Sequence, residues 1–516
     1  MRARHLLLAP ILVLIAFCAP LKGNPTRLPP DLTAALLKGK RLLYNLDVAG
    51  AEAQMQHVVQ AYPRYPHGRV YLAYITFIKY AMNMPNDSLA RVLLTDIDEA
   101  IQATKRFYQQ TGDEVEYRFN LGLCYGIKGF YYGVERNYFK TYWFGKKGKG
   151  NLEKVVALDS TYEDAYLGLG IYHYFTALLP GIVRFMASIL GFHGDRQKGI
   201  QEMHRTAERG LLFKEEAWFT YATTRYFLEG AYQEGLTIFK WLLDRYPGNA
   251  ALRLMIGYHY RRNGHILQAR RYFEAVPDSI GRALPDIFNW KTYNLGTIYF
   301  MENRFQQAEA LFSKMDRSRL ARSPYLQAAT NFYLGLLADL KFNRRQALAY
   351  YQKIPKNNQT EFWYYLSRMH VDYPMDSLTY RWVVADNLLS VRNYEAARRL
   401  GLRLWSDLLH RKTVPNPNLK PLVVDLIARS LLYQGRLKEA RHEFERILAE
   451  AKKMPDKIRR SWIYIHYARC LRALGEYELA RRYLDRAHEA DDQYTRLIIA
   501  RERHVLDKLK KQSKQG

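Results

Sequence analysis

Residues 292–312 read TYNLGTIYFMENRFQQAEALF, and this stretch decides the fold. Its key positions are Leu295, Gly296, Tyr299, Ala308 and Phe312. Large residues that recur three to four positions apart indicate two helices. Gly296 and Ala308 are small enough for the backbones of these helices to cross closely. The stretch therefore predicts a helical hairpin whose large side chains pack around one tight crossing.

The same spacing returns along the chain. Its further copies are Ile256, Gly257, Tyr260, Ala269 and Phe273; Leu334, Gly335, Ala347 and Tyr351; Ile427, Leu431, Ala440 and Phe444; and Tyr467, Ala468, Leu471, Ala480, Leu484 and Ala487. Turns that contain glycine separate the paired helices, at Asn263-Gly264, Gln434-Gly435 and Leu474-Gly475. No stretch sustains the two-residue period of a strand. Five copies in one register predict an all-α array of stacked hairpins.

This spacing resembles the tetratricopeptide repeat, and the resemblance implies an all-α, tetratricopeptide-type superhelical solenoid. Weaker copies bring the expected number to about eleven helical hairpins. We expect an N-terminal array over residues 24–355, an irregular linker over residues 356–380 and a C-terminal array over residues 381–516. A charged helix from about Asp492 to Lys511 is expected to cap the second array.

The N-terminus is typical of a secretory signal, because basic residues precede an almost wholly apolar run from Leu6 to Ala19. The run is too short to span a bilayer comfortably and matches a signal core. Cleavage after Gly23 would remove residues 1–23. Lipid attachment through Cys18 and an uncleaved anchor are the alternatives. We therefore expect an exported protein of the periplasm or outer cell envelope.

Two hairpins break the regular spacing. In the first, the second helix is expected to resume only near Leu152, after an insert at about residues 126–147 that mixes aromatic residues with lysines. In the second, the insert covers about residues 175–197, and its segment 178–192 is almost wholly apolar with Arg184 as its one charge. Such a segment is expected to pack. It either fills the concave side of the array, or forms a lid over an apolar groove or a foot in a lipid surface.

Around this second insert the chain resembles a known family. The stretches AYLGLG (165–170), LLP (178–180) and GFHGDR (191–196), followed by Gly199, resemble a bacterial family of exported tetratricopeptide proteins. They are also similar to the eukaryotic Iml2 and tetratricopeptide-repeat-protein-39 family, over roughly residues 120–250. The resemblance implies adaptor roles, some connected with lipid handling, and brings no catalytic residues. The export signal departs from the eukaryotic members, so their cellular role does not transfer.

The formal net charge is +28, and arginines recur in pairs, several of which occupy equivalent places in successive hairpins. The pairs are Arg261-Arg262, Arg270-Arg271, Arg344-Arg345, Arg398-Arg399, Arg459-Arg460 and Arg481-Arg482. Stacking would align them into a basic strip. The strip is either a set of solvated faces or a surface for an acidic partner.

No catalytic or metal-binding pattern emerges. The GKKGKG stretch at residues 145–150 lacks the Lys and Ser or Thr that a phosphate-binding loop places after its last glycine. The 14 histidines show no metal-ligand spacing, and no Gly-x-Ser-x-Gly occurs. Cys124 and Cys470 lie too far apart along a linear array for a disulfide. We therefore expect no enzyme activity, no cofactor and no metal.

We expect a non-catalytic cell-envelope adaptor or scaffold that binds a protein or peptide in the groove of the solenoid. One alternative is a carrier or sensor of a lipid or apolar ligand that uses residues 178–192, with peripheral membrane contact. A third hypothesis is a nucleic-acid-binding helical repeat, but nucleic acid is not an expected partner of an exported protein. The expected binding residues are Tyr125, Tyr132, Tyr142, Trp143, Tyr166, His173, Leu179, Pro180, Phe185, Asp195, Arg196, Tyr226, Tyr260 and Tyr299.

Overall fold

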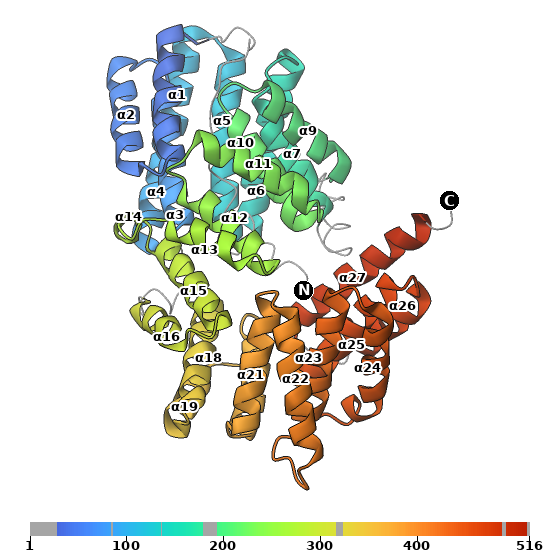
Figure 1. The fold of residues 1–516 in the computed structure, drawn as a ribbon. Coiled ribbons are helices and arrows are strands. Elements are labelled where there is room, and N and C mark those ends of the chain that lie inside the picture. Colours follow the sequence, from blue (N-terminus) through green and yellow to red (C-terminus); the bar gives the residue numbers. More distant parts are fainter. Residues whose placement is uncertain are drawn as a thin grey trace. The chain divides into compact units, whose positions relative to one another are not determined.

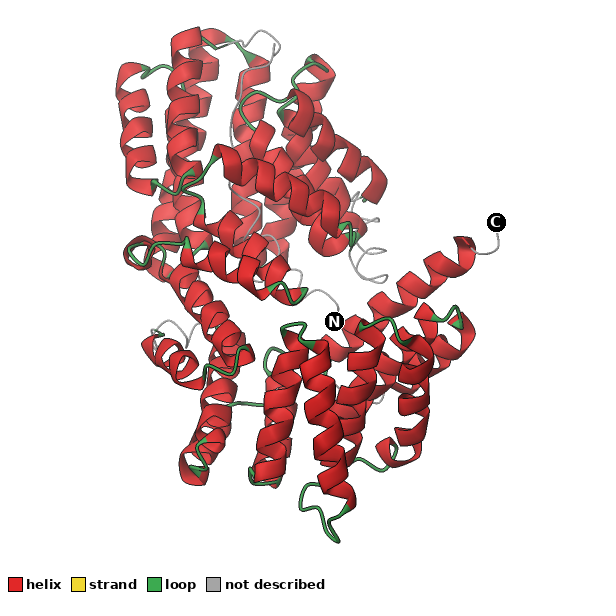
Figure 2. Ribbon diagram, in the orientation of Figure 1, coloured by secondary structure: helices red, strands yellow, loops and turns green. Residues whose placement is uncertain are grey.

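A computed structural model describes residues 28–83, 86–135, 137–178, 193–315, 323–487 and 492–512. These residues form helices joined by turns and loops, with no strand among them (Figure 2). The all-α prediction is confirmed. The expected signal at residues 1–23 and Cys18 lie outside the described residues. The chain divides into two compact units: unit 1 is Met1–His259 with Ala275–Ile287, and unit 2 is Tyr260–Glu274 with Phe288–Gly516.

Unit 1 consists of consecutive helices that pair as hairpins (Figure 1). Its helices are α1 (Pro30–Tyr44), α2 (Val48–Ala61), α3 (His67–Ala81), α4 (Asp87–Thr111), α5 (Glu114–Val134), α6 (Tyr138–Leu158), α7 (Ala165–Ala177), α9 (Arg196–Arg209), α10 (Lys214–Thr223) with the π-helical turn η2 (Thr224–Leu228), α11 (Tyr232–Arg245), α12 (Ala250–Arg262) and the short α14 (Ile280–Ala283). The contacting pairs are α1 with α2, α3 with α4, α5 with α6, α7 with α9, and α10 with α11.

Unit 2 continues the same pattern. Its helices are α13 (Ile266–Glu274), α15 (Pro285–Met301), α16 (Phe305–Lys314), α18 (Pro324–Leu340), α19 (Arg344–Tyr351), α20 (Glu361–Asp372), α21 (Ser377–Ser390), α22 (Tyr394–Leu409), α23 (Leu419–Tyr433), α24 (Leu437–Ala451), α25 (Lys457–Ala473), α26 (Tyr477–Arg486) and α27 (Gln493–Gln512). The division between the units falls within α12 and α15. Counted along the described chain, the consecutive pairs number eleven, as expected, while the short α14, α20 and α27 belong to none of these pairs.

The hairpins close at the small residues that the spacing singled out. A Cβ atom added to Gly296 would lie 2.9 Å from the ring of Phe312, and one added to Gly335 would lie 2.5 Å from the ring of Tyr351. Ala308, on the helix that pairs with α15, is fully buried. The predicted register is therefore confirmed at these two hairpins, because Phe312 and Tyr351 each pack against the glycine of their own repeat.

The turn inside a hairpin places one residue in the left-handed backbone region. The predicted glycine turns use Gly264, Gly435 and Gly475, whose φ angles are 72°, 78° and 82°. Four other hairpins use Leu46, Asn303, Phe342 and Arg392, whose φ angles are 61°, 59°, 57° and 64°. For a non-glycine residue, this left-handed backbone conformation is unfavourable by about 1–2 kcal/mol. The helices on either side impose the turn geometry, whichever residue occupies it.

Unit 1 closes on itself. The first hairpin meets the loop before α12, about two hundred residues later: the Asn249 side chain donates to the Tyr44 carbonyl at 2.8 Å, and the Tyr44 and Tyr246 rings are 5.6 Å apart. Tyr44, Tyr80 and Tyr174 are buried almost completely. Many tyrosines of this unit are therefore core residues and do not line an open groove.

Unit 2 is closed by α20, a helix without a partner of its own. The Trp363 ring packs 5.4 Å from Phe332 of α18. On the other side, the Arg459 guanidinium donates to the Leu366 carbonyl at 3.3 Å, and the Gln493 amide donates to the Glu361 carboxylate at 2.7 Å. The helix thus bridges the early and late hairpins of the unit.

The observed division of the chain differs from the expected one. Residues 356–380, expected as an irregular linker, contain α20, and the change from one compact unit to the other occurs between residues 260 and 287. The departure from the repeat spacing at 356–380 has a different cause: α20 packs across its unit instead of pairing with the next helix. The expected terminal helix is present as α27 and packs on α25 and α26.

The tightest crossing predicts a stability effect. A Cβ atom on Gly170 of α7 would lie 2.8 Å from the carbonyl oxygen of Gly199 and 2.8 Å from the amide nitrogen of Met203, both backbone atoms of α9. We expect Gly170→Ala to lower the free energy of unfolding of unit 1 by about 1–3 kcal/mol, because the helices must separate. Urea unfolding followed by circular dichroism measures this loss.

The matched control is Gly150→Ala on α6, where an added Cβ atom meets nothing within 4 Å. This substitution should raise stability by about 0.5–1 kcal/mol, because alanine loses less conformational entropy in a helix. Equal effects of the two substitutions would contradict the proposed close crossing.

Candidate functional site

The first insert is a helical extension and not a loop. α5 continues to Val134 and α6 begins at Tyr138, so the expectation that the second helix resumes near Leu152 is wrong. Glycines account for the difference: a Cβ atom on Gly129 would lie 3.0 Å from the Gly145 amide nitrogen, and α5 and α6 lie side by side (Figure 1). The glycines that resemble a flexible stretch in the sequence allow two backbones to pack closely.

The end of this hairpin carries a surface that we call the aromatic–basic tip. It comprises Tyr138, Phe139, Tyr142, Trp143, Lys140, Lys146 and Lys147. Phe139 and Tyr138 are 75% and 74% exposed, the highest values for large hydrophobic side chains in the described part of the chain, and Trp143 is 49% exposed. The Lys147 ammonium lies 5.1 Å from the Trp143 ring centroid. A cation over the face of an aromatic ring is attracted by the π electrons of the ring. The lysines therefore help to hold the aromatic side chains in place.

Two further predicted residues support the tip from α5. The rings of Tyr125 and Tyr132 both stack on Phe144, with centroids 6.1 Å and 5.5 Å apart. The Lys140 ammonium lies 4.7 Å from the Tyr132 ring, and burial raises the pKa of Tyr125. The structure therefore brings four predicted residues together: Tyr125, Tyr132, Tyr142 and Trp143.

The predicted residues around α7 and α9 make structural contacts. His173 Nδ1 lies 2.6 Å from Glu202 Oε2, and both side chains are buried. The guanidinium of Arg205 lies 3.8 Å from the Tyr166 ring centroid.

Asp195 caps α9 by accepting from the amides of Gln197 and Lys198, each at 3.0 Å. Arg196 forms its ion pair with Glu229, at 2.7 Å, and not with its neighbour Asp195.

The remaining predicted residues are dispersed. Leu179, Pro180 and Phe185, with most of the segment 178–192, lie outside the described residues. Tyr226 is buried, and its hydroxyl lies 2.8 Å from His259 Nδ1. In unit 2, Tyr260 stacks on Tyr272, and the Arg304 guanidinium lies 4.4 Å from the Tyr299 ring.

A buried polar cluster in the interior of unit 1 escaped the sequence analysis. The Lys40 ammonium of α1 lies 2.9 Å from a Glu216 carboxylate oxygen of α10, with both side chains almost inaccessible. The same ammonium lies 4.2 Å from the Phe213 ring. Burial lowers the pKa of Lys40 and raises that of Glu216, while their mutual attraction opposes both shifts. Lys40 lies one helical turn from Leu36 and Tyr44, which are both buried, and so shares their face of α1. This spacing is the sequence signal that could have predicted a buried lysine.

The cluster extends through further buried carboxylates. Asp164 accepts from the amides of Leu212 and Phe213, at 2.8 Å and 2.9 Å, and so holds the chain where α10 begins. Glu116 accepts from the Tyr162 hydroxyl at 2.9 Å and lies 3.0 Å from His67. These contacts pair several of the buried polar groups, and the tyrosines around them are core residues.

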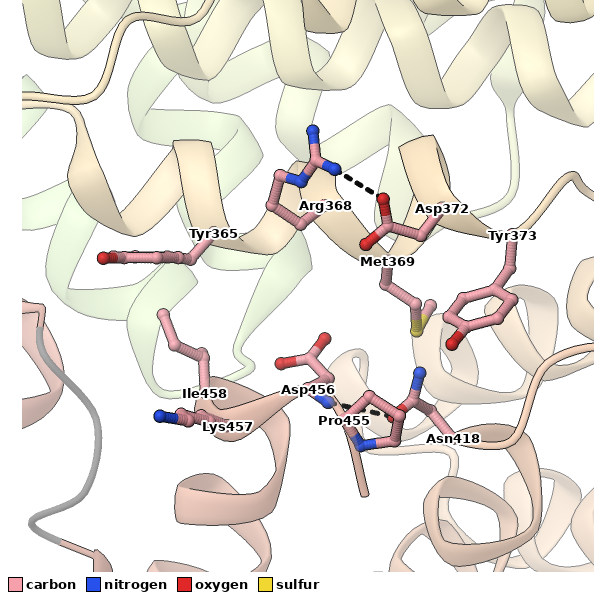
Figure 3. Close-up of a pocket in the computed structure, with 10 residues that line it drawn as sticks. All are labelled: Tyr365, Arg368, Met369, Asp372, Tyr373, Asn418, Pro455, Asp456, Lys457 and Ile458. Atoms are coloured by element: carbon pink, nitrogen blue, oxygen red, sulfur yellow. Dashed lines mark hydrogen bonds and ion pairs between the residues drawn. The ribbon is translucent and has the colours of Figure 1, made fainter. Parts of the chain in front are cut away.

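A groove in unit 2, which we call the α20 groove, has a volume of about 320 Å³. It lies between α20 and the start of α25 (Figure 3). Its lining residues are Tyr365, Arg368, Met369, Asp372, Tyr373, Asn418, Pro455, Asp456, Lys457 and Ile458. Figure 3 shows Tyr365 and Tyr373 on opposite sides of the opening, with Met369 between them and Ile458 on the facing segment. The floor is apolar and buried, because Met369 and Ile458 are largely inaccessible.

The charges of the α20 groove are partly neutralised. Arg368 pairs with Asp372 at 2.5 Å along α20, and Asp456 pairs with the buried Arg459 at 2.5 Å. Lys457 is exposed at the edge. The sequence signal for this groove was the aromatic run EFWYYLSRMHVDY at residues 361–373. Because residues 356–380 were expected to form a linker, the run was not predicted to belong to a binding site.

The paired arginines have several kinds of partner. Arg270 lies 3.0 Å from Glu302 of the next helix pair, and Arg481 pairs with Asp507 of α27. Arg398 and Arg399 pair with Glu395 on their own helix, whereas Arg271, Arg345 and Arg482 are exposed. The expected basic strip is therefore interrupted by ion pairs within and between helices.

Three further observations concern the described residues. No cluster of three or more His, Cys, Asp or Glu side chains there could hold a metal ion. No described helix combines the length and apolarity needed to cross a bilayer. Cys124 and Cys470 are both free and buried.

Two family models match the chain. Residues 154–362 match Iml2/Tetratricopeptide repeat protein 39, and residues 422–493 match a tetratricopeptide repeat model. The chain is a tetratricopeptide repeat protein. The first match begins before α7 and includes Asp195, Arg196 and the buried Glu216. No curated protein matches the sequence.

Solved structures of tetratricopeptide repeat proteins are similar to this chain at low identity. One is a tetratricopeptide repeat protein from Parabacteroides merdae, 16% identical, covering 56% of this chain and 98% of its own, with a TM-score of 0.23. Another is yeast Tom70, 14% identical, covering 90% of this chain and 91% of its own, with a TM-score of 0.31.

The buried cluster of this repeat protein predicts a pH dependence. Glu215 is buried, neither carboxylate oxygen has a hydrogen-bond partner among the described residues, and burial raises its pKa to about 8. Between pH 4.5 and pH 8 the folded state then holds a proton that the unfolded state releases. We expect the free energy of unfolding of unit 1 to fall across this window, with Glu215 contributing up to about 1.4 kcal/mol per pH unit.

Urea unfolding at a series of pH values measures the slope. Glu215→Gln should remove the contribution of this carboxyl, whereas Glu153→Gln, at an exposed position of α6, should leave the slope as it is. An unchanged slope in Glu215→Gln would show that this carboxyl is not the buried proton carrier.

Proposed function

We propose that this tetratricopeptide repeat protein is a non-catalytic adaptor of the cell envelope that binds a protein partner through a peptide segment in the α20 groove. Stacked hairpins offer long surfaces for docking. In unit 1 the interior is occupied by the buried cluster around Lys40 and Glu216. The α20 groove in unit 2 is a cavity of about 320 Å³ whose buried apolar floor, Met369 and Ile458, is flanked by the half-buried Tyr365 and Tyr373, and this observation carries the proposal.

The lining of the groove indicates the chemistry of the segment. Met369 and Ile458 form an apolar floor that suits one or two apolar side chains of a peptide. Tyr365 and Tyr373 are half-buried, so their rings can pack on a peptide while their hydroxyls stay hydrated. Exposed Lys457 at the edge, with the Lys356 ammonium 5.0 Å from the Tyr365 ring, favours an acidic residue beside the apolar one.

A selection from a random peptide library on the full chain tests this site. We expect enrichment of segments that place an acidic residue next to an apolar residue. Binding of a selected peptide, measured by fluorescence anisotropy, should weaken at least tenfold in Tyr373→Ala, because a half-buried aromatic side chain at a groove is typical of a hot spot. Lys457→Glu should weaken it about five- to tenfold through charge repulsion.

The matched control is Lys438→Glu, which makes the same charge change at an exposed position of α24 outside the groove lining. Its affinity should remain within twofold of the parent protein, and circular dichroism should show all variants folded. Equal affinity of the Tyr373→Ala and parent proteins, or a selection without enrichment, would refute the groove as the binding site.

The envelope location is part of the proposal and rests on the apolar run from Leu6 to Ala19 behind a basic start. Expression in a bacterial host should give a protein that osmotic shock or membrane washing releases. N-terminal sequencing should read Asn24-Pro25-Thr26. A chain that begins at Met1 in the cytosolic fraction, or a lipid on Cys18, would contradict cleavage after Gly23.

A further inference from the structure

The aromatic–basic tip exposes apolar rings that a folded protein ordinarily covers. Phe139 and Trp143 are one helical turn apart on α6, so their rings lie on the same face. Tyr138 and Tyr142 repeat this spacing on the neighbouring stripe. Large exposed apolar groups that gather on one helix face mark a surface for interaction.

The charges of the tip are of one sign. Residues 137–152 contain four lysines and no aspartate or glutamate. Lys149 pairs with Glu153 at 2.6 Å, but Lys140, Lys146 and Lys147 have no carboxylate partner among the described residues and are exposed. An anionic surface would supply the charges that these three lysines lack.

The lysines also lie where an interfacial helix needs them. The Lys146 and Lys147 ammonium groups lie 5.8 Å and 5.1 Å from the rings of Tyr142 and Trp143. Both positive charges therefore lie over exposed or half-exposed aromatic rings of the tip. Helices that bind in the plane of a membrane combine such rings with lysines, which extend their charge to the headgroups.

From these observations we propose that the aromatic–basic tip is a membrane foot: Phe139 and Trp143 enter the headgroup–acyl boundary of an anionic bilayer, while Lys140, Lys146 and Lys147 bind lipid phosphates. A bilayer is favoured over single-stranded nucleic acid, because strand binding uses a basic groove with a stacking floor. Here the rings stand on the outer face at the start of a helix. The inference is independent of the α20 groove, which lies in the other unit.

Vesicle cosedimentation of the full chain tests the foot. Phosphatidylcholine vesicles that contain phosphatidylglycerol should bind the protein, and pure phosphatidylcholine vesicles should bind it much less. Replacing Lys140, Lys146 and Lys147 together by glutamine should weaken binding about 100-fold, because each lysine near an anionic surface contributes roughly fivefold. The double substitution Phe139→Ser and Trp143→Ser should weaken it at least tenfold.

Matched controls come from the same unit. Leu158→Ser changes a residue that is 54% exposed at the opposite end of α6, and Lys105→Gln changes an exposed lysine of α4. Both should bind vesicles like the parent protein. Every variant carries the same apolar N-terminal run, so any lipid binding by that run is common to all.

Circular dichroism verifies that the variants fold, and a uridine oligonucleotide provides the competing ligand. Stronger binding to the oligonucleotide than to vesicles would overturn the proposal, as would equal vesicle binding by the tip variants and the controls.

Discussion

The close approach of paired helices at small residues is the constraint on which the structure depends. Gly170 and Gly199 bring α7 against the backbone of α9, and Gly335 receives the ring of Tyr351. The residue at the crossing limits how closely the two helix backbones approach, so it must be small. The large residues of the repeat therefore pack on either side of the crossing. The long α5–α6 hairpin applies the same device, with Gly129 against Gly145. What looks like a flexible glycine-rich insert in the sequence is therefore a rigid extension that carries the aromatic–basic tip.

Charge performs two different tasks in these hairpins. Between neighbouring hairpins, arginines such as Arg270 reach acidic residues such as Glu302 and add ion pairs at partly exposed positions. Exposed pairs of this kind contribute little stability each. Inside unit 1, by contrast, Lys40 and Glu216 are paired at almost inaccessible positions. Removing one partner there would leave a buried charge, so this pair constrains which helices can meet and favours the closed arrangement of the unit.

These two uses of charge explain why a number of the basic residues already have an acidic partner. After the inter-hairpin pairs are formed, the lysines of the tip stand out because residues 137–152 contain no acid to neutralise them. The α20 groove has the opposite character, with paired charges around an apolar floor. The two surfaces therefore suit different ligands: the tip suits an anionic surface, and the groove suits a short segment with an apolar side chain.

The repeat spacing by itself determined the helical hairpins, their register, their number and the glycine turns, because these depend on contacts between residues less than thirty-five positions apart. The departure from that spacing also placed Tyr132, Tyr142 and Trp143 in one insert, directly after Tyr125. Only the tertiary structure decided that α1 returns to the loop before α12, that α20 bridges its unit, and that Lys40 meets Glu216. These contacts join residues about ninety to two hundred positions apart. A local pattern carries no information on which distant helices meet, since that depends on how small rotations accumulate over many stacked hairpins.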